Sequence, residues 1–247
     1  MQLVEESSLP APKPGEVRIK VLYAGVNFTD IMIRKGMYPE VKTQPPFTPG
    51  YDMVGVVAQT GEGVTRFREG GLVAAMPVIG AWAEHVCLPG ADLVYMPETL
   101  SPAEVVPLVL SYVTAYQLLH RVAKVQAGQK ILVHGAGGAV GTALLQLGKL
   151  QGLEMYGTAS QAKHELIRDL GATPIDYRNE DVAARMKTLA PEGLDAVFDP
   201  IGGKNFSTSF SLLRKGGKLA AFGFYNAITG KGGSIPMDFM RLQLWNI

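Results

Sequence analysis

The chain has 247 residues, of which 47% are hydrophobic and 18% charged, and its formal net charge is +1. This length supports one large or two moderate domains, and the near-neutral charge argues against a nucleic-acid partner or an acidic membrane surface. The single cysteine, Cys87, excludes an internal disulfide and a cysteine-based zinc cluster. We find no signal peptide and no apolar segment long enough to span a bilayer, so we expect a cytoplasmic protein.

Before residue 100 the pattern predicts short strands separated by turns. Apolar stretches bounded by glycine and proline occupy 17–26, 49–64, 68–76 and 81–88. We therefore expect residues 1–104 to form an all-β, barrel-like domain. A helix should begin after Ser101, which suits the N-cap position, because Pro102 follows at the first helical position.

From about residue 105 onward, strands are expected to alternate with helices. The predicted strands are 130–134, 153–158, 173–177, 194–199 and 217–224. The predicted helices are 103–121, 139–151, 161–170, 181–189 and 204–213. This alternation indicates a parallel, doubly wound α/β sheet, which we assign to residues 105–247.

The most informative motif is ILVHGAGGAVG at residues 131–141, where an apolar strand leads through a glycine-rich turn into a helix. Such a turn lets the backbone approach a pyrophosphate, and the helix N-terminus offers free N–H groups to that anion. The predicted cofactor contacts here are Gly135, Ala136, Gly137, Gly138, Ala139, Val140 and Gly141. Ala136 replaces the first glycine of the G-x-G-x-x-G pattern, so a purely structural βα turn stays an alternative.

The end of the next strand indicates which dinucleotide binds. NAD-binding units usually carry an acid there, about 20 residues beyond the glycines, to bind the ribose hydroxyl. This chain has no acid at 157–160, and Ser160, Lys163 and Tyr177 offer the hydroxyl, ammonium and phenol groups that suit a 2′-phosphate. NADPH is therefore favoured over NADH. Alternatively, Ser160 caps a helix and Lys163 is a solvated surface lysine.

Several motifs in fixed order resemble one family over nearly the whole chain. They are AGVNFTD (24–30), TPGYDMVGVV (48–57), YVTAYQLL (112–119), the glycine turn, GTASQAKHE (157–165) and DPIGG (199–203). The chain resembles the medium-chain dehydrogenase/reductase superfamily, and in particular its zinc-independent quinone oxidoreductases, including zeta-crystallins and the vesicle amine transport-like proteins. The resemblance implies a GroES-like barrel, a Rossmann domain and an active site in the cleft between them.

The resemblance also carries expectations for individual residues. Zinc-dependent members have a cysteine where this chain has Asn27, and a His-Glu pair where it has Tyr51 and Asp52, so we expect no metal site. The four histidines lie on separate predicted elements without ligand spacing. Thr114 is expected to face the cofactor, and Asp30 to be a structural hydrogen-bond acceptor. The nicotinamide should lie near the segment after the fifth strand, at Gly223, Phe224, Tyr225 and Asn226.

Without zinc, the protein has to stabilise a developing oxyanion with hydrogen-bond donors. Asn27 and Tyr38 are the catalytic candidates, and Asn27 is also a candidate cofactor contact. Each has a structural alternative, Asn27 as a turn residue and Tyr38 as a half-buried aromatic. Hydride addition to a quinone or an enone gives a delocalised anion, so such conjugated acceptors are the expected substrates.

The chain also departs from the family. We count five Rossmann strands where the usual order has six, and the sequence stops at 242–247, so we expect a truncated form with strand 217–224 as a bare edge. Because that edge commonly forms the family's dimer contact, its absence weakens the expectation of a homodimer. The alternative function is a non-catalytic NADPH-binding or interaction protein that pairs with a full-length relative. A reductase module of a larger synthase is disfavoured by the lack of flanking linkers.

Overall fold

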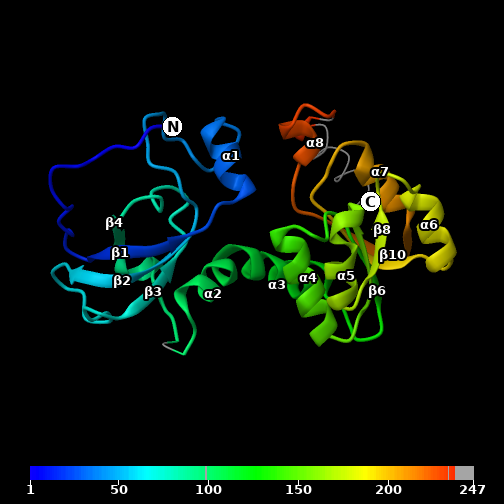
Figure 1. Cartoon of the computed structure of the whole chain (residues 1–247), viewed down its shortest axis with the longest axis horizontal. Coiled ribbons are helices and arrows are strands. Elements are labelled where there is room, and N and C mark those ends of the chain that lie inside the picture. Colours follow the sequence, from blue (N-terminus) through cyan, green and yellow to red (C-terminus); the bar gives the residue numbers. More distant parts are fainter. Residues whose placement is uncertain (98, 233, 237–247) are drawn as a thin grey trace. The chain divides into compact units, whose positions relative to one another are not determined.

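The computed structural model describes residues 1–97, 99–232 and 234–236, and it divides the chain into two compact units (Figure 1). The first unit spans Met1–Leu110 and the second begins at Ser111. The boundary expected between residues 104 and 105 falls inside helix α2 (Pro102–Pro107). Residues 242–247, where we expected a premature end, lie outside the described residues.

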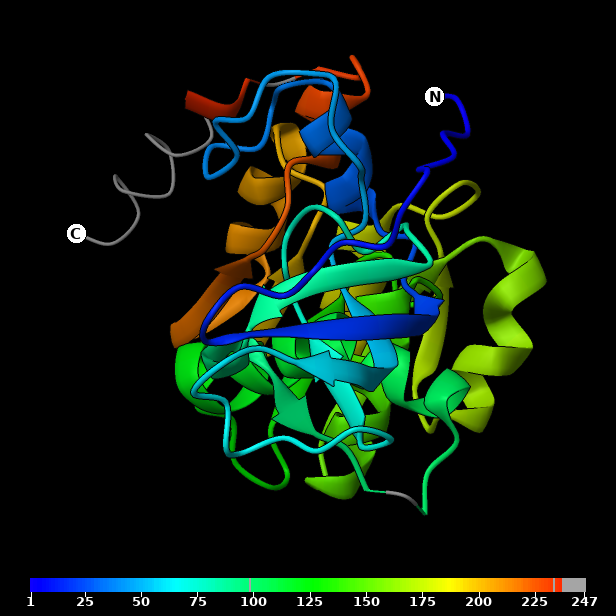
Figure 2. The ribbon, with the colours of Figure 1, turned by 90° about the vertical axis from the view of Figure 1, so that its left-hand side faces the viewer.

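The first unit is built on a five-stranded antiparallel sheet with the order β4-β1-β2-β3-β5 (Figure 2). The strands are β1 (Glu16–Ala24), β2 (Met53–Thr60), β3 (Leu72–Ala75), β4 (His85–Pro89) and β5 (Val94–Tyr95). Val17 and Ile19 alternate with polar neighbours along β1 and are fully buried against Met53 and Val73. The expected β-rich N-terminal domain is confirmed.

One helix of this unit was not predicted. Helix α1 (Phe28–Arg34) has only seven residues and follows Asn27 at the N-cap position. The Asp30 carboxylate accepts the backbone N–H of Asn27 at 2.7 Å, which is half of a capping box. This local bond begins the helix directly after β1, so the strand expected over 17–26 ends at Ala24.

The helical segment expected over 103–121 is present as a run of short pieces. After α2 come η2 (Leu108–Tyr112), α3 (Val113–Tyr116) and η3 (Gln117–Ala123), of which η2 and η3 have π-helical geometry. The predicted start is confirmed, since the Ser101 hydroxyl accepts the Glu104 N–H at 3.4 Å and Pro102 follows the cap. The segment ends at Lys124, which adopts the left-handed conformation.

The second unit, coloured from green to red in Figure 1, contains a five-stranded parallel sheet with the order β10-β9-β6-β7-β8. Its strands are β6 (Lys130–Val133), β7 (Glu154–Ala159), β8 (Thr173–Asp176), β9 (Leu194–Asp199) and β10 (Leu213–Ala221). Numbered along the chain, this is the 3-2-1-4-5 order of a Rossmann sheet, so the predicted doubly wound fold is confirmed. Within the described residues, β10 lies at an edge.

Helices cover both faces of this sheet. They are α4 (Ala139–Leu150), α5 (His164–Asp169), α6 (Val182–Leu189) and α7 (Lys204–Ser211); a short η4 (Gln161–Lys163) precedes α5, and α8 (Tyr225–Ile228) follows β10. Ile131 and Val133 pack with α3, α4 and α5, whereas Leu132 between them packs with α6 on the other face. Alternate residues of one central strand thus serve two hydrophobic cores.

Candidate functional site

Hydrogen bonds to Thr158 on the next strand, β7, fix the backbone of the glycine turn after β6. Gly135 has a φ of +64°, a conformation that disfavours a side chain. Its N–H donates to the Thr158 hydroxyl at 3.2 Å, and the Ala136 N–H donates to the Thr158 carbonyl at 3.0 Å. Gly138 is the N-cap of α4, whose first-turn N–H groups have no acceptor within the helix. The predicted turn therefore has the backbone form of an anion cradle.

Two close approaches explain the composition of this turn. A Cβ at Gly141 would lie 2.4 Å from the Gly135 oxygen and 2.7 Å from the Ala136 Cα, so the helix touches the turn through backbone alone. A Cβ at Gly157 on β7 would lie 2.7 Å from the Ala136 methyl group. The missing side chain at Gly157 thus leaves room for Ala136, which stands where the pattern has its first glycine.

The residues expected to contact a 2′-phosphate follow two adjacent strands. Ala159 and Asp176 are paired at the ends of β7 and β8, so Ser160 and Tyr177 emerge at the same sheet edge. The Lys163 ammonium donates to the Gly137 carbonyl at 2.6 Å, which draws this exposed side chain across the glycine turn. The Arg178 guanidinium, which sequence reasoning did not consider, lies 5.7 Å from the Tyr177 ring centroid.

The segment after β10 lies against the loop that follows β9. A Cβ at Gly223 would lie 2.8 Å from the Pro200 carbonyl oxygen, and the Tyr225 N–H donates to that oxygen at 3.1 Å. The rings of Phe224 and Phe206 meet edge to face with centroids 6.1 Å apart. The predicted nicotinamide segment is therefore fixed at the carboxyl ends of the strands, where ligands bind in such sheets.

Thr114 lies on α3, which packs against α4 in the second unit. The structure places it beside the cradle helix, and its contact with a cofactor stays a prediction.

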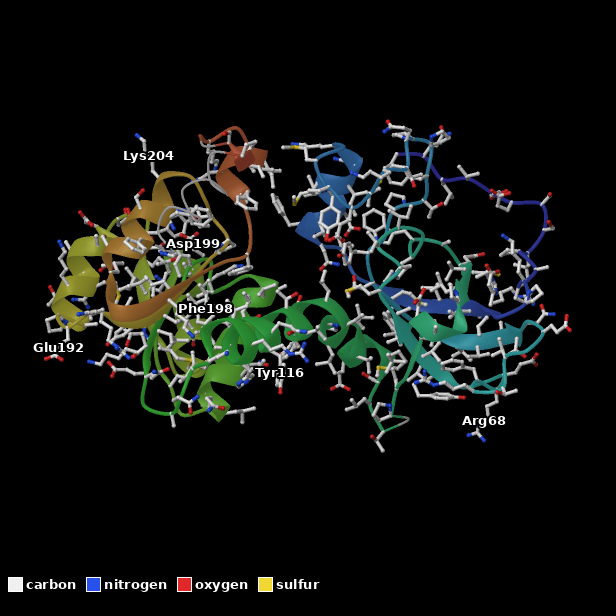
Figure 3. The ribbon with its side chains drawn as sticks, turned by 180° about the vertical axis from the view of Figure 1, so that it is seen from behind. Arg68, Tyr116, Glu192, Phe198, Asp199 and Lys204 are labelled. Atoms are coloured by element: carbon white, nitrogen blue, oxygen red, sulfur yellow. The ribbon has the colours of Figure 1, made fainter. Side chains whose placement is uncertain are left out.

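A buried polar chain beneath the glycine turn was missed by the sequence reasoning. The Ser209 hydroxyl lies 2.6 Å from a carboxylate oxygen of Asp199, which is labelled in Figure 3, and 3.1 Å from His134 Nε2. On the other side of the imidazole ring, His134 Nδ1 lies 3.2 Å from the Thr158 hydroxyl. Since the carboxylate accepts the Ser209 proton, Ser209 accepts from His134 Nε2–H, and Nδ1 accepts from Thr158. Thr158 also receives the Gly135 N–H. These hydrogen bonds thus connect the Asp199 carboxylate to the backbone of the glycine turn.

Burial decides the protonation state of His134 in this row of hydrogen-bonded side chains. All four side chains are almost completely buried, and burial lowers the pKa of His134, so the imidazole is neutral at physiological pH. A polar residue at the end of an otherwise apolar strand, as in ILVH and LDAVFD, is the sequence signal that points to such a chain.

In the first unit, Asn27 lies between two buried carboxyl groups. Its side-chain amide donates to Asp52 at 2.6 Å, and its backbone N–H donates to Asp30 at 2.7 Å. Burial raises the pKa of Asp52 to about 6, and the nearby Asp30 adds to the rise against the lowering effect of the Asn27 bond. Burial also raises the pKa of Asp30. Asn27 is therefore fixed by ionisable partners on both sides.

Tyr38, the second catalytic candidate, pairs with Tyr51. Their hydroxyl oxygens are 2.7 Å apart and their rings meet edge to face. Tyr51 is buried and directly precedes Asp52 in sequence, so these two adjacent residues connect the Tyr38–Tyr51 pair to the Asn27–Asp52 pair. We refer to Asn27, Asp30, Tyr38, Tyr51 and Asp52 as the donor cluster. Sequence reasoning named Tyr51 only as a residue that replaces a zinc ligand.

Within residues 1–97, 99–232 and 234–236, no three His, Cys, Asp or Glu side chains are grouped so that they could hold a metal ion. Over the same ranges, no helix has the length and apolar character needed to cross a membrane.

Comparisons with known proteins cover both units. Residues 13–98 match the family described as alcohol dehydrogenase GroES-like domain, and residues 139–247 match the family described as zinc-binding dehydrogenase. Among curated relatives, the rat synaptic vesicle membrane protein VAT-1 homolog is 39% identical over 90% of this chain and 55% of its own length. Rat quinone oxidoreductase is 33% identical over 92% of this chain and 70% of its own length.

Solved structures of similar proteins have a similar fold. The quinone oxidoreductase of Pseudomonas syringae has a TM-score of 0.82 and 33% identity, covering 89% of this chain and 68% of its own. A mycobacterial protein solved in complex with NADPH has a TM-score of 0.84 and 32% identity, covering 97% of this chain and 74% of its own. The chain spans about half the length, 55%, of the VAT-1 relative.

Proposed function

The chain belongs to the medium-chain dehydrogenase/reductase superfamily, on its quinone oxidoreductase branch, and from this premise we propose that it is an NADPH-dependent, zinc-independent reductase of quinones or α,β-unsaturated carbonyls. The observation that carries the proposal is the glycine turn, because strand β7 beside it ends at Ala159 and is followed by Ser160, without a carboxylate. Such an edge suits a phosphorylated ribose better than a free ribose diol.

The side chains around this edge fit NADPH. An ammonium group has three donors, so Lys163 keeps two for a phosphate while one reaches the Gly137 carbonyl. Asp176 is the nearest acid at the end of β8, and its carboxylate accepts the Arg178 N–H at 3.0 Å and the Asn179 amide at 2.7 Å. The Asp176 carboxylate is thus already engaged as an acceptor within its own loop.

The donor cluster does not fit a catalytic zinc site. Zinc needs several Cys, His or carboxylate ligands that converge on one point. At the position of the family's zinc-binding cysteine, Asn27 turns an N–H donor toward Asp52, which uses the carboxylate as an acceptor. This chemistry supports the proposal that the chain works without a catalytic zinc ion, although one matching family is described as zinc-binding dehydrogenase.

Neutral hydrogen-bond donors support reduction of a conjugated acceptor. NADPH supplies the hydride when it is bound. Asn27 and Tyr38 are the proposed donors to the substrate oxygen, where negative charge develops as the hydride arrives. Thr114, Gly223, Phe224 and Tyr225 are the proposed neighbours of the nicotinamide.

The direct test is NADPH oxidation by purified protein in the presence of 9,10-phenanthrenequinone or an alkenal, followed at the nicotinamide absorbance band. Turnover above a protein-free blank is expected. NADPH that raises the melting temperature without any turnover would support the alternative of a non-catalytic binding protein. Folded protein that neither binds nor oxidises NADPH contradicts both functions.

The cofactor preference has a separate test. Lys163→Ala should lower the ratio of NADPH to NADH affinity about tenfold, since a hydrogen bond to a charged group contributes roughly 1.5–3 kcal/mol. Lys215→Ala removes an exposed lysine far along the chain, on β10, and serves as the matched control. An unchanged ratio in Lys163→Ala would exclude Lys163 as the 2′-phosphate contact.

A further inference from the structure

The Tyr38–Tyr51 pair joins a partly buried tyrosine to a buried one. Tyr51 is 7% exposed, whereas Tyr38 is only partly buried. The hydroxyl oxygens are 2.7 Å apart, an ordinary O–H···O distance, and the rings meet at 82° with centroids 5.8 Å apart. One of the two hydroxyls must donate to the other, and the choice decides which proton is left for a ligand.

The burial of Tyr51 favours one direction of this bond. Burial raises the pKa of the Tyr51 phenol, and the charges of Glu40 and Asp52 act in the same direction. Tyr51 therefore keeps its proton, and a buried hydroxyl needs an acceptor for it. Tyr38 is the acceptor within reach. When Tyr51 donates to the Tyr38 oxygen, the Tyr38 proton is free to point elsewhere, and it becomes a stronger donor because hydrogen bonds in a chain polarise one another.

The backbone around Tyr51 is held in a strained arrangement. The Val78 N–H donates to the Tyr51 carbonyl at 3.1 Å, although Val78 has a φ of +72°, which is rare for a β-branched residue. The Ala81 N–H donates to the Gly50 carbonyl at 3.2 Å, and a Cβ at Gly50 would lie 2.5 Å from the Trp82 backbone nitrogen. Strain of this kind persists where the surroundings over-determine the backbone, and it concentrates at functional sites.

We propose that Tyr51 is a positioning residue that holds the Tyr38 hydroxyl as the donor to the substrate oxyanion. This inference rests on the proposed reductase function. In that reaction the hydride bonds to the β-carbon of the enone, the C=C electron pair shifts to form an enolate, and its negative charge rests on the oxygen. The Tyr38 O–H stabilises that charge, water supplies the proton that completes the product, and Tyr51 keeps its own proton throughout.

The experiment compares Tyr51→Phe, Tyr38→Phe and the double variant, with Tyr23→Phe, an exposed tyrosine of β1, as the matched control. We expect Tyr51→Phe to lower kcat for an alkenal about tenfold with little change in the KM for NADPH, as the loss of one hydrogen bond predicts. In the Tyr38→Phe background the Tyr51 substitution should have no further effect. Independent, multiplicative effects would overturn the inference, because Tyr51 would then act without Tyr38.

A second readout does not need turnover. Binding of 4-nitrophenolate, whose charged oxygen mimics the oxyanion, is followed by its absorbance. Affinity should fall in both single variants and should not fall further in the double variant, whereas Tyr23→Phe should bind like the wild type. Tyr51→His, which keeps a ring N–H donor, should retain more affinity than Tyr51→Phe. If the protein shows no turnover but the phenolate affinities follow this non-additive pattern, the result would contradict the proposed reaction and not the inference about Tyr51. Phenolate binding that is absent from the wild type, or indifferent to Tyr51, would overturn the inference itself.

Discussion

Asp52→Asn is expected to stabilise the first unit at neutral pH. The pKa of Asp52 rises from its ordinary value of 3.8 to about 6, which at 1.36 kcal/mol per pKa unit corresponds to about 3 kcal/mol of penalty when the folded protein holds the ionised form. Asparagine has the same shape, carries no charge and can still accept the Asn27 amide bond. The substitution therefore removes the penalty and leaves the contact in place.

The stability difference between Asp52→Asn and the wild type should depend on pH in one direction only. A carboxyl group with a raised folded-state pKa stabilises the fold below its unfolded pKa, and that contribution is lost as pH rises through the folded pKa. The advantage of Asp52→Asn over the wild type should therefore be small near about pH 4 and should grow by up to about 3 kcal/mol by about pH 8.

Urea unfolding followed by Trp82 fluorescence in a Trp245→Phe background reports on the first unit. Asp92→Asn, at an exposed aspartate of the same unit, controls for the loss of a charge as such. A difference between Asp52→Asn and the wild type that does not change with pH would refute the reasoning.

Two further predictions concern the second unit. Gly141→Ala should destabilise it by about 1–3 kcal/mol and weaken NADPH binding, because the new methyl would overlap the turn backbone, whereas Gly138→Ala, with its nearest contact at 3.2 Å, should be milder. Melting temperatures and NADPH fluorescence titrations compare the pair, and equal losses would contradict this packing argument. Ser209→Ala should cost about 1–3 kcal/mol by leaving a buried imidazole without its acceptor, and Ser207→Ala on the exposed side of α7 should cost almost nothing. Urea unfolding distinguishes them, and similar values would mean that the buried chain contributes little.

The second unit could be predicted from sequence because its signals are local and repeated. Most of its five strands are short apolar runs bounded by turn residues, and the helix after the glycine turn, α4, shows helical spacing of apolar residues. The element boundaries were harder to predict from sequence than the elements themselves. The last strand was expected to begin at residue 217, but β10 begins at Leu213, because Leu213 already pairs with Leu194 before a break in the register that ends at Lys218. In the first unit, seven residues of α1 were too few to show a period beside the strand pattern.

The side-chain networks could not be predicted, because their partners are distant in sequence. Ser209 and His134 are 75 residues apart, and Asn27 and Asp52 are 25 apart. Composition and spacing identify which residues are polar within apolar runs, but only the packed sheet brings Asp199 beneath the glycine turn. The role proposed for Tyr51 could not be predicted for the same reason, since it depends on a contact with Tyr38 across a proline-rich loop.

The donor cluster also constrains which substrates the proposed reaction can use. A bound metal would stabilise an oxyanion by several kcal/mol through direct charge, whereas each preorganised neutral donor contributes roughly 3–4 kcal/mol at a hydrogen-bond distance. Asn27 donates one amide proton to Asp52, so under the proposed function one amide proton and the Tyr38 hydroxyl are left as donors to a substrate. Two neutral donors suffice most readily where the anion spreads its own charge. Under the proposed function, this donor set would favour quinones and enones over isolated ketones, for which the whole charge would rest on a single oxygen.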